Sequence, residues 1–323
     1  MNFKLKQLIL AAAGVLAVGG NAVAQEYPVK PVKIIVGYVA GGGPDMVARA
    51  IGQKLGELLG QPFVVENRPG AGAVPATAAV AKSPADGYTL LLGETGQLVI
   101  APHTSKTLPY NSLRDLVPVA LVTSEPLLLV ANAKTPFKSL EDVLRDAKAS
   151  PGKIAYGSSG IGTIHHIAAE VLKSEAGIDL LHVPYKGSGQ SVPGVLAGDV
   201  PLLITSYAGA GAHIRSGALN LLAVTSRNRL PSAPNVPAIA ELYKGYDYQS
   251  EMGILAPAGT PPAVLNKLSA AIKQATESVD FAAKFKDTAT VVAFRSGPEY
   301  AENLKRNMVK YEQAAKVAKL QPE

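Results

Sequence analysis

The chain has 323 residues and carries 31 Lys and Arg residues against 25 Asp and Glu residues, a formal net charge of +6. The basic residues are spread along the chain without a stripe or a recognised motif, which argues against a nucleic-acid partner. There is no cysteine, so neither a disulfide framework nor a cysteine-based metal site is expected. The length suits one two-lobed domain or two ordinary domains.

The N-terminus has the pattern of a secretory signal peptide. Lys4 and Lys6 precede an apolar run at residues 8–18, which is too short to span a bilayer. A small-x-small sequence then ends at Ala24. We therefore predict that residues 1–24 are a signal peptide, that cleavage follows Ala24, and that the mature chain is exported.

The first mature segment predicts a strand–helix–strand unit. Residues 32–36 form a β-branched run, and apolar residues then recur at helical spacing over residues 47–58. Pro44 suits the first helical turn, and Gly60 ends the helix. A second strand is expected at residues 63–65, and such a unit is the building block of a parallel sheet.

The same alternation continues to the C-terminus. Gly177 is expected to end a helix at Ala176, Thr260 to cap another, and a last helix to cover residues 298–318. Further strands are predicted at residues 88–92, 127–130, 154–156, 182–185, 200–204 and 221–225. Alternating strands and helices predict an α/β fold with parallel sheets.

Three loops rich in glycine or serine each follow a strand and precede a helix. Such loops direct free backbone N–H groups and the positive end of a helix dipole at one space, so together they predict an anion pocket. In open α/β sheets, pockets form at the carboxyl ends of strands, where these loops lie. The loops are residues 157–163, residues 186–189, and Ala40, Gly41, Gly42, Gly43, Pro44 and Asp45.

Several kinds of chemistry are disfavoured. No loop has the P-loop, dinucleotide or G-x-S-x-G pattern, so no cofactor is expected. His165 and His166 are adjacent and point about 100° apart on a helix, so no metal site is expected. Asp45 is interpreted as a first-turn carboxylate in preference to a general base, and Lys186 as either an anion contact or a solvated lysine.

One enzymatic alternative stays open at this point. A secreted hydrolase could use Ser158 or Ser159 as its nucleophile with His165 or His166 as its base. It would need a third group that orients the base.

Six segments together resemble a known family. The chain is similar, over essentially its whole mature length, to the Bug-type receptors of tripartite tricarboxylate transporters, which are periplasmic solute-binding proteins. The resemblance is carried by Ala-Gly-Gly-Gly-Pro-Asp-Met-Val-Ala-Arg at residues 40–49, Val-Glu-Asn-Arg-Pro-Gly-Ala-Gly at 65–72, and the motifs at residues 85–90, 183–189, 214–217 and 256–261.

The resemblance implies a two-lobed periplasmic-binding-protein fold, type II-like, with the ligand cleft between the lobes. Lobe 1 would comprise residues 25–123 and 252–323, and lobe 2 residues 124–251. The solute's carboxylate would be held by backbone amides and ordered waters from opposing loops. The remaining implied ligand-binding residues are Thr95, Ser158, Ser159, Thr163, His165, Tyr185, Lys186, Gly187, Ser188, Gly189, Thr205 and Tyr207.

The resemblance also implies function without catalytic turnover. The chain would capture a small carboxylate in the periplasm and deliver it to the permease subunits of a tripartite tricarboxylate-type transporter. A membrane sensor kinase is the alternative partner. A monomer is expected, because no amphipathic seam is left over for a dimer.

Two positions depart from the family pattern. Pro201 follows Gly198-Asp199-Val200, where relatives often have a phenylalanine-containing segment, and Met252 stands where a tryptophan is usual. The departures leave the solute open between an aliphatic dicarboxylate, an aromatic carboxylate and an amino acid.

Overall fold

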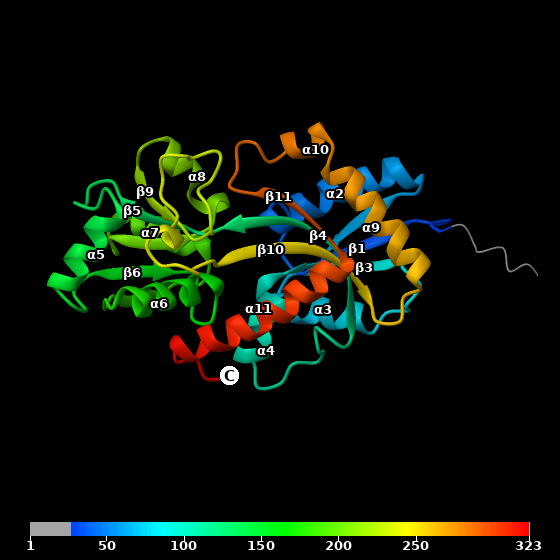
Figure 1. Cartoon of the computed structure of the whole chain (residues 1–323), viewed down its shortest axis with the longest axis horizontal. Coiled ribbons are helices and arrows are strands. Elements are labelled where there is room, and N and C mark those ends of the chain that lie inside the picture. The colour runs from blue at the N-terminus through cyan, green and yellow to red at the C-terminus, as the bar shows by residue number, and fades with distance from the viewer. Residues whose placement is uncertain (1–26, 323) are drawn as a thin grey trace, which may run out of the picture.

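A computed structural model describes residues 27–322, so the predicted signal peptide and its cleavage site lie outside the described residues. Two α/β lobes lie side by side along the long axis of the molecule (Figure 1). We call them the six-stranded lobe and the five-stranded lobe after the sheet in each. The predicted two-lobed α/β fold is confirmed.

The six-stranded lobe contains both ends of the described chain. Its strands are β1 (Val32–Val36), β2 (Phe63–Asn67), β3 (Thr89–Glu94), β4 (Leu116–Pro126), β10 (Gln249–Pro257) and β11 (Val291–Ser296). Its α-helices are α2 (Gly43–Leu59), α3 (Val74–Ala81), α4 (Ala101–Thr104), α9 (Pro262–Thr276), α10 (Val279–Ala283) and α11 (Gly297–Val317). The short helices η1 (Ala71–Ala73) and η2 (Gly96–Ile100) complete it.

The five-stranded lobe is one uninterrupted stretch of chain. Its strands are β5 (Leu128–Asn132), β6 (Ala155–Ser158), β7 (Leu181–Pro184), β8 (Leu202–Thr205) and β9 (Leu219–Val224). Its helices are α5 (Leu140–Ala149), α6 (Ile164–Ala176), α7 (Ser188–Ala197), α8 (Tyr207–Arg215) and the short η3 (Ile239–Glu241).

Apart from the edge strand β11, the two sheets have the same arrangement of strands. The six-stranded sheet runs β11-β4-β10-β3-β1-β2, and the five-stranded sheet runs β7-β6-β8-β5-β9. Leu127 alone separates β4 from β5, and β10 brings the chain back. In each sheet, the strand that enters from the other lobe lies between two other strands: β10 between β4 and β3, and β5 between β8 and β9. The chain thus crosses between the lobes twice (Figure 1).

Strand directions place one edge of each sheet at the junction between the lobes. β1 is parallel to β2 and β3, and β4 runs in the same direction because both β3 and β4 are antiparallel to β10. β4 leads out of its lobe, so the carboxyl ends of β1, β2 and β3 face the five-stranded lobe. β8 is antiparallel to β5 and parallel to β6, and β7 is parallel to β6, so their carboxyl ends face back.

The sheets are mixed, so the prediction of parallel sheets is correct only for part of each. Each crossing strand and its return introduce antiparallel pairs, such as β10 with β3 and β5 with β8. The sequence of a single strand does not reveal whether it pairs in parallel or antiparallel, because a strand buried on both faces is apolar in both cases.

Several predicted element ends are confirmed. α2 begins at Gly43 with Pro44 in its first turn and ends at Gly60, which has the left-handed φ of 70°. α6 ends at Ala176 and is capped by Gly177. The predicted cap at Thr260 is wrong: Pro261 is the residue before α9, and the Thr260 hydroxyl donates to the Pro257 carbonyl at 2.8 Å.

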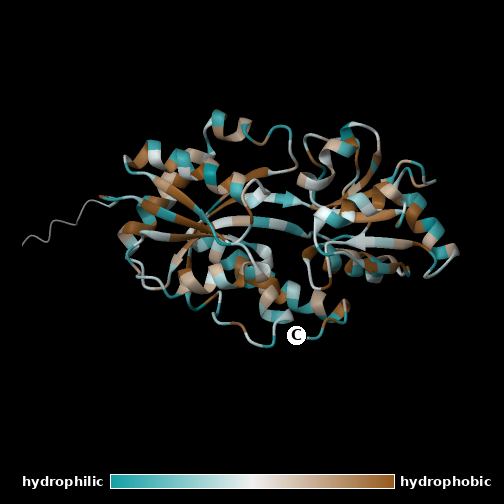
Figure 2. Cartoon of the chain, turned by 180° about the vertical axis from the view of Figure 1, so that it is seen from behind, coloured by the Kyte–Doolittle hydropathy of each residue, from teal (hydrophilic) through white to brown (hydrophobic). Residues whose placement is uncertain are grey.

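Apolar residues concentrate along the strands of both sheets, while the helices alternate between apolar and hydrophilic positions (Figure 2). The core is continuous between the lobes where α11 packs against both β4 and α6. Tyr311 of α11 is 1% exposed and meets the Tyr248 ring edge-on at 5.7 Å between centroids. Within residues 27–322, no helix is both long and apolar enough to cross a membrane.

Candidate ligand-binding cleft

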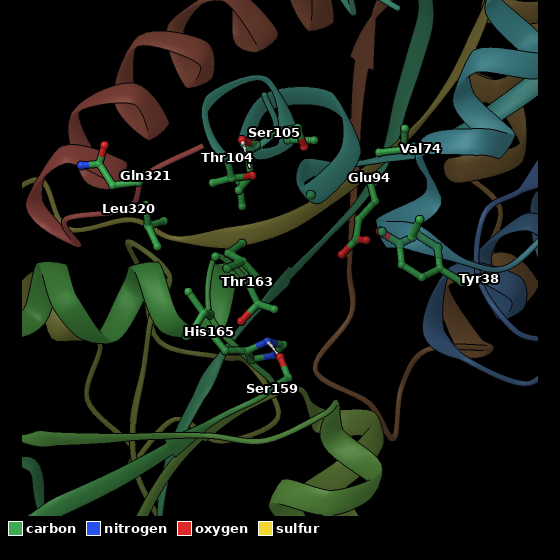
Figure 3. Close-up of a pocket in the computed structure, with 18 of the residues that line it drawn as sticks. Tyr38, Val74, Glu94, Thr104, Ser105, Ser159, Thr163, His165, Leu320 and Gln321 are labelled. Carbon is green, nitrogen blue, oxygen red and sulfur yellow. Dashed lines mark hydrogen bonds between the residues drawn. The ribbon is translucent and has the colours of Figure 1, made fainter. Parts of the chain in front are cut away.

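A cavity of about 630 Å³ lies between the lobes (Figure 3). From the six-stranded lobe it is lined by Tyr38 after β1, by Ala71, Gly72 and Val74 after β2, by Glu94 at the end of β3, and by five residues of the following segment 96–105. From the five-stranded lobe it is lined by residues 161–165 and Ser159, which follow β6. The carboxyl ends of the parallel strands therefore meet here, as expected for the ligand site of an α/β sheet.

Three of the predicted residues line this cavity directly: Ser159, Thr163 and His165. Thr163 is the N-cap of α6, where its hydroxyl oxygen accepts from the His166 backbone N–H and donates to the Gly160 carbonyl. The first turn of α6 thus opens on the cavity with the positive end of its dipole. This wall suits an anionic group of a ligand.

Ser159 is held by a histidine. Its Oγ lies 2.6 Å from Nδ1 of His165, and burial lowers the pKa of His165 to about 4, so the ring is neutral at pH 7. Nε2 of His165 is buried without a hydrogen-bond partner. Since an unpaired buried N–H is rarer than an unpaired acceptor, the hydrogen is assigned to Nδ1, which donates to Ser159. The Ser159 hydroxyl hydrogen is then free to donate to a ligand.

The serine–histidine pairs differ from the hydrolase alternative. Ser158 Oγ lies 2.7 Å from Nε2 of His182, not from His166, and His182 stacks on His166 with centroids 4.1 Å apart. The Ser159–His165 pair has no group at Nε2 that would orient a base, among the residues that the structure describes. The histidines therefore hold the loop after β6 in place. Among the described residues of this loop, neither serine–histidine pair has a third group that would orient the histidine as a catalytic base.

The glycine loop before α2 is fixed by Asp45. Its buried carboxylate accepts from the Gly41 N–H, from Arg49 Nε and from Asn67 Nδ2, each at 2.9 Å. Burial acts to raise the pKa of Asp45, but the hydrogen bonds from Arg49, Gly41 and Asn67 lower it overall. Asp45 is therefore an ionised first-turn carboxylate, which matches the sequence interpretation. Neither it nor the other predicted residues of this loop lines the cavity.

The loop at residues 185–189 adjoins the cavity wall without lining the cavity. The Tyr185 N–H donates to the Ser158 carbonyl and the Gly187 N–H to the Ser159 carbonyl, both at 3.1 Å. The Tyr185 ring packs inward, because a Cβ on Gly194 would lie 2.5 Å from its hydroxyl. Lys186 and Gly189 are exposed, and Gly187 and Ser188 are half-buried at the start of α7.

Thr205 and Tyr207 stand at the next strand end. Thr205 is 1% exposed, and its hydroxyl has no hydrogen-bond partner. Tyr207 begins α8, and its hydroxyl accepts from Arg215 at 2.6 Å. Predicted residue Thr95 joins β3 to β10, since its hydroxyl donates to the Gln249 carbonyl and accepts from the Glu251 N–H. None of the three lines the cavity, and their binding roles stay predictions.

Sequence reasoning missed most of the wall that the six-stranded lobe supplies, including Ala71, Gly72, Val74 and five residues of the segment 96–105. Glu94 and Tyr38 project into one end of the cavity, and Leu320 and Gln321 lie at the other (Figure 3). Glu94 directly precedes Thr95, so the rule that strand ends face the pocket could have found it. The C-terminal residues carry no such signal, because their position depends on the packing of α11.

Among residues 27–322, no group of three or more His, Cys, Asp or Glu side chains is placed to hold a metal ion.

Comparison with known proteins identifies the family. A model of the receptor of the tripartite tricarboxylate transporter family matches residues 47–316. BugT of Bordetella pertussis is 38% identical over 273 residues, which cover 84% of this chain and 83% of BugT.

Two similar solved structures contain named ligands. The Rhodopseudomonas palustris protein Rpa4515 with adipate is 30% identical, with a TM-score of 0.82 over 92% of this chain and 100% of that one. MatC of the same organism with bound malate is 28% identical, with a TM-score of 0.75 over 89% of this chain and 99% of that one. This chain therefore belongs to the tripartite tricarboxylate transporter receptor family of periplasmic solute-binding proteins.

Proposed function

We propose that the mature chain captures a small carboxylate between its lobes and presents it to the permease subunits of a tripartite tricarboxylate-type transporter. The observation that carries this is the cavity of about 630 Å³ at the meeting carboxyl ends of the two sheets. Its size falls within the range of small-molecule sites. Similar structures hold adipate and malate, both carboxylates, in support of the same chemical class here.

The capture step depends on movement of the lobes about β4 and β10. We assign residues 25–123 and 252–323 to one moving body and residues 124–251 to the other. Closure brings the start of α6 toward Tyr38 and Glu94 and removes water from the ligand, as in hinge-bending receptors. The protein binds and releases its solute as a monomer, unchanged and without turnover, after cleavage behind Ala24.

We propose both direct and indirect contacts to the ligand. Ser159, Thr163 and His165 line the cavity and would meet the solute directly. The glycine loop at residues 40–45, the loop at residues 185–189, and the region around Ser158, Thr95, Thr205 and Tyr207 would act through backbone N–H groups, through ordered water, or on closure.

Thermal-shift screening of the mature chain against carboxylates, followed by calorimetry, tests the proposal. A ligand that binds the native state alone raises stability by RT ln(1 + [L]/Kd), about 2.7 kcal/mol at a hundredfold excess over Kd. The expected result is a clear shift with at least one carboxylate, which is recovered unchanged. No shift with any carboxylate, or conversion of the ligand to product, would contradict the proposal.

Two neighbouring serines offer a matched pair of variants. Ser159→Ala removes a hydroxyl that faces the cavity and should weaken carboxylate binding at least about tenfold, since a hydrogen bond to a charged group contributes about 1.5–3 kcal/mol. Ser158→Ala removes a fully buried hydroxyl that lies against His182 and should lower thermal stability more than Ser159→Ala does. Isothermal titration calorimetry measures the change in affinity, and differential scanning calorimetry measures the change in thermal stability. Unchanged affinity in Ser159→Ala would remove Ser159 from the site.

A further inference from the structure

Two carboxylates stand together where the six-stranded sheet meets the cleft. Glu94 ends β3, Glu125 lies near the end of β4, and β10 runs between these strands. Ser250 of β10 pairs directly with Glu125, and its hydroxyl donates to Glu94 Oε1 at 2.5 Å. Side chains directly opposite on antiparallel strands point to the same face. Glu94 and Glu125 therefore share one face of the sheet, at the end that faces the other lobe.

No cation of the described chain neutralises this pair. Glu94 accepts from the hydroxyl of Ser250 and lies beside that of Tyr38. Glu125 is 6% exposed and accepts from the Tyr207 backbone N–H at 3.3 Å. Neither carboxylate forms a salt bridge with any residue in the range 27–322. Burial raises the pKa of Glu125 to about 7, so that carboxyl is partly protonated at neutral pH. A cationic group is the complement of the negative charge that the pair retains.

Glu125 also occupies a position where a ligand's carboxylate would otherwise be favoured. A Cβ on Gly43, the first residue of α2, would lie 3.6 Å from Glu125 Oε2, while the first N–H of α8 donates to Oε1. The protein's own carboxylate thus stands at the positive ends of two helices. A second carboxylate brought to this end by a dicarboxylic acid would meet like charge.

The opposite end of the cavity has the other polarity. Figure 3 shows Glu94 and Tyr38 at one end, and Leu320 and Gln321 at the other. Lys319, which precedes Leu320, is the one Lys or Arg among the described residues that line the cavity. The Ser159 hydroxyl and the first turn of α6 add hydrogen-bond donors from the five-stranded lobe. The cavity is therefore acidic at one end and carries cationic and donor groups elsewhere.

An independent observation also indicates a ligand on the five-stranded lobe. The Thr205 hydroxyl is buried and has no partner. It lies between the first turns of α7 and α8, because a Cβ on Gly209 would be 3.5 Å from both Thr205 Oγ1 and Ser188 Cβ. Leaving such a hydroxyl unpaired is unfavourable, and since Thr205 does not itself line the cavity, an ordered water that links it to the ligand would complete it.

We infer that the solute is an amino carboxylate, whose carboxylate is bound from the five-stranded lobe and whose ammonium group is bound by Glu94, the member of the pair that lines the cavity. The inference rests on the proposed function and narrows its ligand class. It disfavours aliphatic dicarboxylates of equal length, because their second charge would face the acidic end.

The test is calorimetry on the mature chain with ligands matched in length: 4-aminobutyrate against succinate, 5-aminopentanoate against glutarate, and 6-aminohexanoate against adipate. Butylamine is included as a cation without a carboxylate. The expected result is that one amino carboxylate binds at least about tenfold more tightly than its dicarboxylate partner and than the amine. Equal or tighter binding of the dicarboxylates overturns the inference and leaves the proposed function standing. Binding of none of them, or of the amine alone, overturns the inference, and the wider carboxylate screen then decides the proposed function.

A variant pair assigns the effect to the acidic end. Glu94→Gln keeps the size of the side chain and should weaken amino carboxylate binding about tenfold while leaving dicarboxylate binding equal or stronger. Glu141→Gln, on the exposed first turn of α5, makes the same charge change away from the cleft and should leave both affinities unchanged. A Glu94→Gln variant that melts like the parent and binds both classes as before would overturn the role of Glu94.

Discussion

Single residues near the cleft hold ionisation states that depend on burial. Burial is the main cause that raises the pKa of Glu125 to about 7; the nearby charge of Glu94 acts in the same direction, and hydrogen bonds from Tyr207 and Thr290 act against it. Burial lowers the pKa of His165 and that of His182 to about 4. These groups make opposite contributions to the pH dependence of stability.

The signs follow from proton linkage. Between pH 4.5 and 7, folded Glu125 keeps a proton that the unfolded chain releases, so its contribution to the free energy of unfolding falls as pH rises. Between pH 4 and 6.5, the unfolded chain binds protons that folded His165 and His182 do not, so their contribution rises with pH. In the parent protein the two slopes partly cancel.

Replacing Glu125 separates these contributions. From pH 5 to pH 7, the free energy of unfolding of Glu125→Gln should rise relative to that of the parent by about 2 kcal/mol, the linkage expected for a carboxyl shifted from about 4.5 to about 7. Urea unfolding at several pH values, without ligand, measures the difference. Parallel profiles for variant and parent would show that Glu125 is ionised at neutral pH like an ordinary surface glutamate.

At the scale of elements, the sequence predicted those strands and helix ends that depend on nearby residues alone. The run at residues 32–36 is β1 without change, and Gly60 and Gly177 end α2 and α6 through left-handed φ angles. The strands β4, β10 and β11 escaped prediction. They lie side by side in the six-stranded sheet, where their pairing depends on contacts far along the chain.

The same division holds for the cleft. Ser159, Thr163 and His165 were found because a serine- and glycine-rich loop before a helix is a local pattern. Glu94 was missed because it lies two residues beyond the strand predicted at residues 88–92, and because a carboxylate is not an anion-binding group. Residues 319–321 reach the cavity through the packing of α11, which no nearby sequence pattern records.

Gly37, which follows β1, lies so close to the loop after β2 that no larger residue fits there. A Cβ on Gly37 would lie 2.1 Å from Cβ of Ala73, and neighbouring residues 71, 72 and 74 line the cavity. Gly37→Ala should therefore destabilise the fold by about 1–3 kcal/mol through overpacking and also weaken ligand binding. Denaturant unfolding and calorimetry measure the two effects.

Gly56 in α2 is the matched control. A Cβ there would meet its nearest atom, the Gln61 carbonyl oxygen, at 3.5 Å, which is an ordinary contact. Gly56→Ala should stabilise the helix by up to about 1 kcal/mol and leave affinity alone. If Gly37→Ala proved as stable as Gly56→Ala, the close approach of β1 to this loop would be refuted.

At the scale of the whole molecule, three segments connect the lobes. β4 and β10 cross between the sheets, and α11 starts on the six-stranded lobe and packs against α6 of the other (Figure 1). Within the five-stranded lobe, α6 is itself held in place by Tyr246, whose hydroxyl donates to the Ala168 carbonyl at 2.7 Å. The end of the chain is thereby held against the lobe that must move during capture, and its last described residues become part of the cavity wall.

Leu320 is the residue through which this arrangement can be tested. It is partly buried against the core that includes α6, and with Gln321 it forms one end of the cavity (Figure 3). Leu320→Ala should loosen the closed, liganded state and speed ligand dissociation by about tenfold, equivalent to about 1.4 kcal/mol of lost apolar contact. Stopped-flow tyrosine fluorescence during ligand displacement measures this rate. Val317→Ala, at an exposed position one turn earlier, removes a side chain of similar kind and should leave it unchanged. Equal dissociation rates in all three proteins would mean that the C-terminal segment lines the cavity without helping to keep it closed.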